Sequence, residues 1–145
     1  PKGNSPPQAR NFIDFVDSNS SMSLTWIYNG DYSMTSGHNA FKKYYKDSRE
    51  KIAIFSCSDP MAIGFIKEAS KNNIDIPKHI KIAGYDNLPM CENITPTLTS
   101  ISTNYNLLGK QVIKFLNDNE QDQADSDGYL NLLPVKLALR SSTKN

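Results

Sequence analysis

Two short, mostly apolar runs in the middle of the chain constrain the fold more than any other feature. Residues 52–55 read IAIF and residues 80–84 read IKIAG, as strands covered on both faces would. Between them, Asp59 can cap a helix whose first position is taken by Pro60. A strand, a helix and a second strand in this order predict parallel pairing with a right-handed crossover.

The same alternation extends on both sides of this unit. Apolar residues at helical spacing predict helices over 7–18, 33–48 and 104–117, and β-forming residues predict a strand at 24–28, LTWIY. Residues 85–103 show no period. The sequence therefore predicts an α/β fold, a parallel sheet with flanking helices.

The end of the chain is less regular. Residues 119–128 are acidic and read as a poorly ordered loop. Residues 129–140 read as extended, with Pro134 favouring a break or an edge position.

Composition narrows the class of protein. With 145 residues and 38% hydrophobic content, the chain can build one domain-sized core. Its 16 basic and 15 acidic residues leave a net charge of +1, which provides no electrostatic footprint for nucleic acid. No apolar run approaches the ~20 residues of a membrane span. The opening residues, from Pro1, read as a loop from the middle of a protein, and we expect a fragment.

The two cysteines, Cys57 and Cys91, have neither metal-ligand nor redox-motif spacing, so we expect free thiols in a reducing cytosol. The chain has no GxSxG, HExxH, P-loop or GxGxxG motif. Neither His38 nor Cys57 has an obvious partner for acid–base or nucleophilic work. We therefore expect no catalytic site, no metal and no cofactor.

Polar and aromatic side chains follow each predicted strand. In open parallel sheets, ligands bind beyond the carboxyl ends of the strands. There the sequence has Tyr32 after the first strand, Ser58 and Asp59 after the second, and Asp86 after the third. Carboxylates that accept paired hydroxyls, together with aromatic faces, suit a sugar. Each residue also has a structural explanation: Asp59 as a helix cap, Asp86 as a turn residue and Tyr32 as the cover of a helix end.

Several motifs occur in a family order. The stretch SCSDPMAIGFIKEASKNNIDIPKHIKIAGYDNLPMCENITPTLTSI, residues 56–101, resembles the central block of the effector-binding domain in the lactose/galactose-repressor family of bacterial transcription regulators. NYNLLGKQ at 104–111 and LLPVKLALRSST at 132–143 resemble the family's later helix and last strand. Upstream, NGDYSMTSGHNA at 29–40 is similar to its aromatic-bearing loop.

The resemblance implies a type I periplasmic-binding-protein-like fold of two lobes with the effector between them. Residues 1–103 would then form the C-terminal lobe, and 104–128 a crossover helix and loop belonging to the N-terminal lobe. Residues 129–145 would be a return strand and tail. The DNA-binding headpiece would be absent from this chain.

The resemblance also assigns roles to individual residues. Asp86 matches the acid that takes a pair of effector hydroxyls, and Ser58 stands where the family usually has Asn. Arg10 matches an effector-binding arginine, although Ile13 occupies a position where the family has Gly. The ligand-binding residues implied in this way are Asp86, Ser58, Asp59, Tyr32, Tyr105 and Arg10.

The expected function is the effector-sensing part of a cytoplasmic transcription regulator, with a sugar as the effector and operator DNA bound only through the headpiece. A homodimer would use Leu88, Met90, Ile63 and Ile66, although the loop that carries Leu88 and Met90 could equally pack on its own domain. A sugar-binding receptor of a transport system is the alternative with the same fold, and an enzyme on this fold is a third class.

Overall fold

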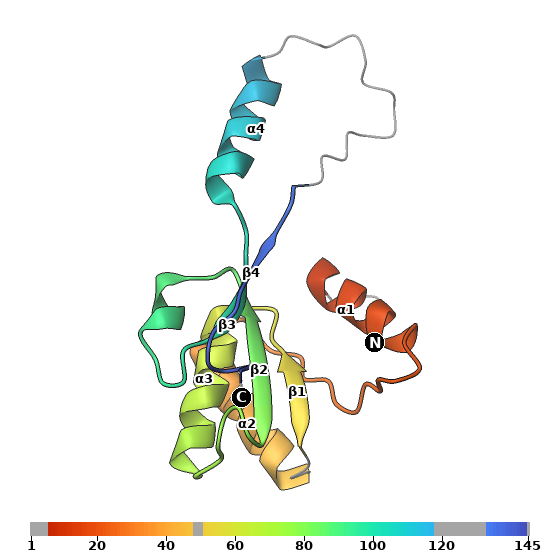
Figure 1. Cartoon of the computed structure of the whole chain (residues 1–145), viewed down its shortest axis with the longest axis vertical. Coiled ribbons are helices and arrows are strands. Elements are labelled where there is room, and N and C mark those ends of the chain that lie inside the picture. The colour runs from red at the N-terminus through yellow and green to blue at the C-terminus, as the bar shows by residue number, and fades with distance from the viewer. Residues whose placement is uncertain (1–5, 48–50, 118–132, 145) are drawn as a thin grey trace.

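The computed structural model describes residues 6–47, 51–117 and 133–144 (Figure 1). Helices and strands alternate along most of this length. The elements are α1 (Pro7–Asp17), α2 (Met34–Asp47), β1 (Ile52–Phe55), α3 (Asp59–Lys71), β2 (Ile80–Tyr85), the 3-10 helix η2 (Pro89–Glu92), β3 (Thr99–Ser102), α4 (Tyr105–Asn117) and β4 (Lys136–Ala138).

The four strands form one sheet in the order β1-β2-β3-β4. β1 pairs with β2 in parallel, with Ile52 opposite Ile80, and β2 pairs with β3 in parallel. β4 runs antiparallel to β3, with Lys136 opposite Ser102. The predicted parallel sheet with flanking helices is confirmed, and the carboxyl ends of β1, β2 and β3 share one edge.

The main core lies between the sheet and the helix pair α2–α3. Phe41 on α2, Ile63 on α3 and Ile82 on β2 are each at most 1% exposed. The rings of Phe41 and Phe65 meet edge to face at 5.2 Å. Removing this apolar surface from water stabilises the sheet with its helices α2 and α3, and makes the sheet a rigid support for the loops at its edge.

α1 lies beside β1, on the side away from the main core. Ile52 and Ile54 pack against the main core, so the alternate side chain of β1, Phe55, points the opposite way. Its ring lies 4.9 Å from the ring of Phe12 on α1. In Figure 1, α1 accordingly stands apart from α2 and α3, beside β1.

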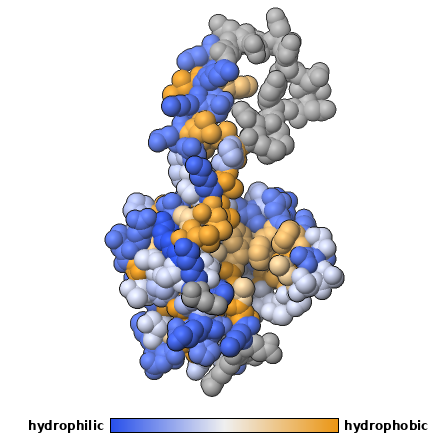
Figure 2. Space-filling view, in the orientation of Figure 1, coloured by the Kyte–Doolittle hydropathy of each residue, from blue (hydrophilic) through white to orange (hydrophobic). Residues whose placement is uncertain are grey.

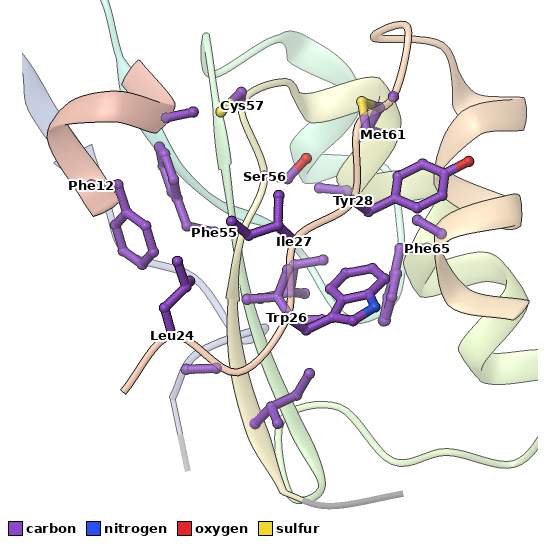
Figure 3. Close-up of a pocket in the computed structure, with 18 of the residues that line it drawn as sticks. Phe12, Leu24, Trp26, Ile27, Tyr28, Phe55, Ser56, Cys57, Met61 and Phe65 are labelled. Carbon is purple, nitrogen blue, oxygen red and sulfur yellow. The ribbon is translucent and has the colours of Figure 1, made fainter. Parts of the chain in front are cut away.

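The predicted strand at 24–28 is wrong, because the sheet ends at β1. The β-forming residues of this segment serve the core instead: Trp26 stacks on Tyr28 and meets Tyr44 edge to face, both at 5.9 Å. A cavity of about 880 Å³ is lined both by this segment and by β1 (Figure 3). Packing of the aromatic rings therefore overrides the β-propensity of the segment.

The carboxyl-terminal half also differs from expectation. Residues 85–103 have no sequence period, yet β3 forms within them. The extended segment expected over 129–140 contains only the short strand Lys136–Ala138, while 129–132 lie outside the described residues. The strand is also antiparallel to β3, unlike the parallel pairing expected for the sheet.

α4 extends away from the sheet and its flanking helices (Figure 1). The side chain of Asn104 caps it by accepting from the N–H of Leu107 at 2.9 Å. None of its residues is buried, and large apolar side chains are exposed along it (Figure 2). These are Leu108, Val112, Ile113, Phe115 and Leu116. Within the described ranges, no helix has the length and apolar character needed to cross a membrane.

Gly84 on β2 provides a test of the packing at the sheet edge. A methyl group there would collide with Oδ1 of Asp59 and lie 3.0 Å from Leu98. We expect Gly84→Ala to lower the free energy of unfolding by about 1–3 kcal/mol, measured by urea denaturation. Gly109→Ala is the control, because nothing lies within 4 Å and Ala favours a helix by about 0.5–1 kcal/mol. Equal stability of the two variants would contradict this packing.

Candidate functional site

Polar side chains gather where the three parallel strands end. Ser56 and Ser58 follow β1, Asp86 and Asn87 follow β2, and Tyr105 begins α4 just after β3. Three segments of sequence thus reach one place, because parallel strands deliver their carboxyl ends to the same edge. This edge is the candidate ligand site.

Asp86 and Tyr105 form the centre of the site. The phenol of Tyr105 donates a hydrogen bond to Oδ1 of Asp86 at 3.0 Å, and its ring is 55% exposed. The hydrogen bond to Asp86, followed by partial burial, raises the pKa of Tyr105 above its ordinary value. The structure therefore brings together an acceptor for hydroxyl groups and an aromatic face.

The turn that carries Asp86 has an unusual backbone. Asp86 has φ 100° and Asn87 has φ 53°, both in the left-handed region that non-glycine residues rarely occupy. The amide of Asn87 donates to Ser102 at 3.4 Å, but its oxygen Oδ1 is buried and the described residues offer it no donor. A buried acceptor without a donor costs free energy, which adds to the strain of this turn.

Ser58 and Tyr32 meet through the main chain. The hydroxyl of Ser58 accepts from the N–H of Met61 at 3.4 Å, which caps α3, and donates to the carbonyl of Tyr32 at 3.4 Å. Ser58 is only 4% exposed, whereas Tyr32 is 50% exposed with φ 66°. Ser58 thus holds the loop that presents the Tyr32 ring, and its own hydroxyl is occupied in doing so.

Asp59 is not the helix cap that the sequence suggested, because Ser58 takes that position. Asp59 is the first residue of α3 and has no exposed surface. Its Oδ1 accepts from the hydroxyl of Ser100 at 2.6 Å, and its Oδ2 accepts from the N–H of Leu88 at 2.7 Å. Both oxygens are therefore occupied inside the protein, and the expected contact of Asp59 with a ligand is replaced by a contact with the turn.

Two residues of this network escaped the sequence reasoning. Ser100 lies in the stretch 85–103, which shows no sequence period, and Gly84 is the last residue of the run IKIAG. The signal that points to a strand at Ser100 is the β-branched residues of TLTSI, residues 97–101.

Arg10 lies on α1 and is exposed. α1 packs beside β1, whereas Asp86 follows β2. A role for Arg10 at the ligand site stays a prediction.

The cavity beside β1 overlaps the candidate site only at one end. Tyr32, Ser56 and Cys57 line it, but Asp86 and Tyr105 do not. Its walls are largely apolar and aromatic side chains such as those labelled in Figure 3. Burial raises the pKa of the Cys57 thiol, which makes it a poor nucleophile.

The expected dimer contacts need one correction. Ile63 is 0% exposed and Ile66 is 1% exposed, because both belong to the core between α3, α2 and the sheet. They are therefore not available to a partner on the surface of this chain. Leu88 is half-buried and Met90 packs partly against the core, and their part in a dimer stays a prediction.

Across the described parts of the chain, no three His, Cys, Asp or Glu side chains are grouped so that they could hold a metal ion.

Comparison with known proteins places this arrangement in a family. The family model of the periplasmic binding protein-like domain matches residues 10–143. The NTD biosynthesis operon regulator NtdR of Bacillus subtilis strain 168 is 33% identical over 119 residues, which cover 81% of this chain and 36% of the relative. The chain thus spans less than two-fifths of the length of the first curated relatives that it matches.

Two solved structures have the same fold. The lac repressor dimer bound to operator and the anti-inducer ONPF matches with a TM-score of 0.82 and 25% identity, over 94% of this chain and 46% of that chain. A LacI family transcriptional regulator from Enterococcus faecalis V583, with bound ribose, matches with a TM-score of 0.78 and 28% identity. This second match covers 97% of this chain and 51% of that chain.

The pair Asp86–Tyr105 is open to a direct test. Because the protonated phenol donates to the carboxylate, Asp86→Ala should lower the pKa of Tyr105 toward its ordinary value. The measurement is a pH titration of ring-labelled tyrosine by carbon-13 NMR, with the signal assigned through Tyr105→Phe. Asp31→Ala, at an exposed carboxyl on another loop, should leave the Tyr105 titration unchanged. An unchanged pKa of Tyr105 in Asp86→Ala would show that the contact does not form in solution.

Proposed function

The chain belongs to the family of periplasmic binding protein-like domains, and on this basis we propose that it senses a small-molecule effector, a sugar, for a bacterial transcription regulator. Its curated relatives are regulators of transcription, and two of its structural relatives hold ribose. This regulator would work in the cytoplasm, where its operator DNA lies. The transport-receptor alternative has the same fold, whereas the curated relatives cited here are regulators of transcription.

The observation that carries the proposal is the placement of Asp86. Its carboxylate stands at the carboxyl edge of β2, beside the exposed ring of Tyr105. A carboxylate can accept hydrogen bonds from two neighbouring hydroxyl groups, and an aromatic ring can cover the apolar face of a sugar. Asp86 and Tyr105 offer both kinds of contact within one small area.

Tyr32 and Arg10 belong to the proposed site as outer members. Tyr32 presents its ring from the loop before α2, held by Ser58. Arg10 would add a guanidinium, whose N–H groups can donate hydrogen bonds to the oxygens of a sugar. Ser58 and Asp59 act in this proposal through the loops that they hold.

Residues 104–128 are proposed to belong to a second lobe, which faces the first across the effector. The exposed apolar side chains of α4, such as Leu108, Val112 and Phe115, support this, because a row of this kind requires a cover. Residues 118–128 lie outside the described part of the chain.

An effector bound between two lobes favours one arrangement over another only by its difference in affinity for the two. In the proposed regulator this preference would reach operator DNA through a separate headpiece, in a homodimer. Leu88 and Met90, in the loop after β2, are the candidates for contact with the partner subunit.

A thermal-shift assay with sugars tests the proposal on the full-length protein that carries this chain. Ribose and a panel of other sugars are added to the wild type, to Asp86→Ala and to Asp75→Ala, which alters an exposed carboxyl elsewhere. We expect one sugar to raise the melting temperature of the wild type and of Asp75→Ala, because binding to the native state stabilises it. Asp86→Ala should lose most of the shift, with a Kd at least about tenfold weaker. An undiminished shift in Asp86→Ala would show that the sugar binds elsewhere.

A further inference from the structure

We propose that Asp59 is a positioning residue for Asp86: with Ser100, it fixes the turn at residues 86–88 and thereby aims the Asp86 carboxylate at the ligand. The inference rests on the proposed function, in which Asp86 binds the effector. Asp59 would never touch the effector itself.

Three consecutive N–H groups define this turn. The N–H of Asp86 donates to the carbonyl of Ile101 at 2.9 Å, which continues the sheet. The N–H of Asn87 donates to the hydroxyl of Ser100 at 3.0 Å, and the N–H of Leu88 donates to Oδ2 of Asp59 at 2.7 Å.

The second and third of these contacts converge on one carboxylate. The hydroxyl that accepts from Asn87 also donates to Oδ1 of Asp59 at 2.6 Å. Asp59 therefore accepts a hydrogen bond from the N–H of Leu88 directly, and it holds the N–H of Asn87 through the hydroxyl of Ser100. One side chain thus holds two successive backbone positions immediately after Asp86.

The turn needs this support because its backbone is strained. Left-handed φ values at two successive non-glycine residues, Asp86 and Asn87, persist only where the surroundings enforce them. Without acceptors for the N–H groups of Asn87 and Leu88, the turn is free to relax. The carboxylate of Asp86 would then leave its place beside Tyr105.

The support is rigid and shielded from water. Asp59 and Ser100 are both 0% exposed, and Gly84 leaves room for the carboxylate against β2. Asp59 also lies at the first position of α3, where the helix dipole favours a negative group. The thiol of Cys91 faces it too: burial and a hydrogen bond to Asp59 raise the pKa of Cys91 to about 12. Competing water is therefore excluded from the bonds that hold the turn.

α3 links the turn to the core. Ile63 and Ile66 hold this helix in the main core, one and two turns beyond Asp59. The position of Asp86 is thus fixed relative to the packed core, although Asp86 itself lies on a surface loop. A side chain that binds a ligand keeps the geometry of its hydrogen bonds only when neighbouring residues hold it in place, as Asp59 does here.

Ser142 provides a matched control for Ser100. Both are buried serines with no exposed surface, and each hydroxyl accepts from one backbone N–H and donates to one oxygen. Ser142 donates to the carbonyl of Ile82 at 2.7 Å and accepts from the N–H of Thr99 at 2.9 Å, without contact to residues 86–88. A purely structural role predicts that Ser100→Ala and Ser142→Ala have the same consequences.

The experiment titrates Tyr105 by NMR in the full chain for Ser100→Ala, Ser142→Ala, Asp59→Ala and Asp59→Asn. Ser100→Ala should lower the pKa of Tyr105 by at least about half of the decrease caused by Asp86→Ala, while Ser142→Ala should leave it unchanged. Asp59→Asn should keep the pKa of Tyr105 near that of the wild type, because its amide can accept from Leu88 and donate to Ser100. Asp59→Ala should lower the pKa of Tyr105. If Asp59→Ala fails to fold, the comparison of Ser100→Ala with Ser142→Ala tests the positioning role.

Ligand binding provides the second readout, with ribose as the probe. Ser100→Ala should weaken its Kd by about tenfold relative to Ser142→Ala at equal thermal stability. Equal effects of the two serine variants on Tyr105, or no effect of either, would overturn the positioning role. Failure of the wild type to bind any sugar would count against the proposed function alone, because the Tyr105 titration requires no ligand.

Discussion

A carboxylate that is cut off from water has to be satisfied by the protein around it, and the carboxyl edge of this sheet is organised by that requirement. Asp59 has no exposed surface, so its oxygens collect the hydroxyl of Ser100 and the N–H of Leu88. These contacts require Gly84 on β2, where a larger residue would fill the space of the carboxylate. The shape of the exposed turn thus follows from a charge that no ligand reaches.

Much of the fold follows from local signals, and the exceptions have physical causes. The apolar runs of β1 and β2, with Pro60 at the start of α3, predict the central parallel unit correctly. β3 has no apolar period because it is rich in hydroxyl side chains, and Thr99 and Ser100 are buried by hydrogen bonding instead. The segment 24–28 has strand propensity, but the aromatic contacts of Trp26 decide its course.

The site could be predicted only in part. The topology of a parallel sheet is enough to bring Asp86 near the other strand ends, and the family resemblance adds Tyr105. The division of labour between Ser58 and Asp59 is beyond sequence reasoning, because a one-residue shift of the helix start decides it. Side-chain direction also decides the fate of Ile63, which helical spacing alone places equally well inside or on a partner-facing surface.

The connection between the lobe and α4 has a mechanical consequence. β3 leads out to α4 and β4 returns beside it, with Ser102 opposite Lys136, so two paired strands form the stem. The returning strand is anchored at once: Arg140 bonds to Leu98 and Glu92, and the buried Ser142 bonds to β2 and β3. A stem of two ribbons bound side by side and clamped at the base bends far more easily across its flat face than within its plane. We therefore expect bending of this stem to move α4 mainly across the flat face of the strand pair.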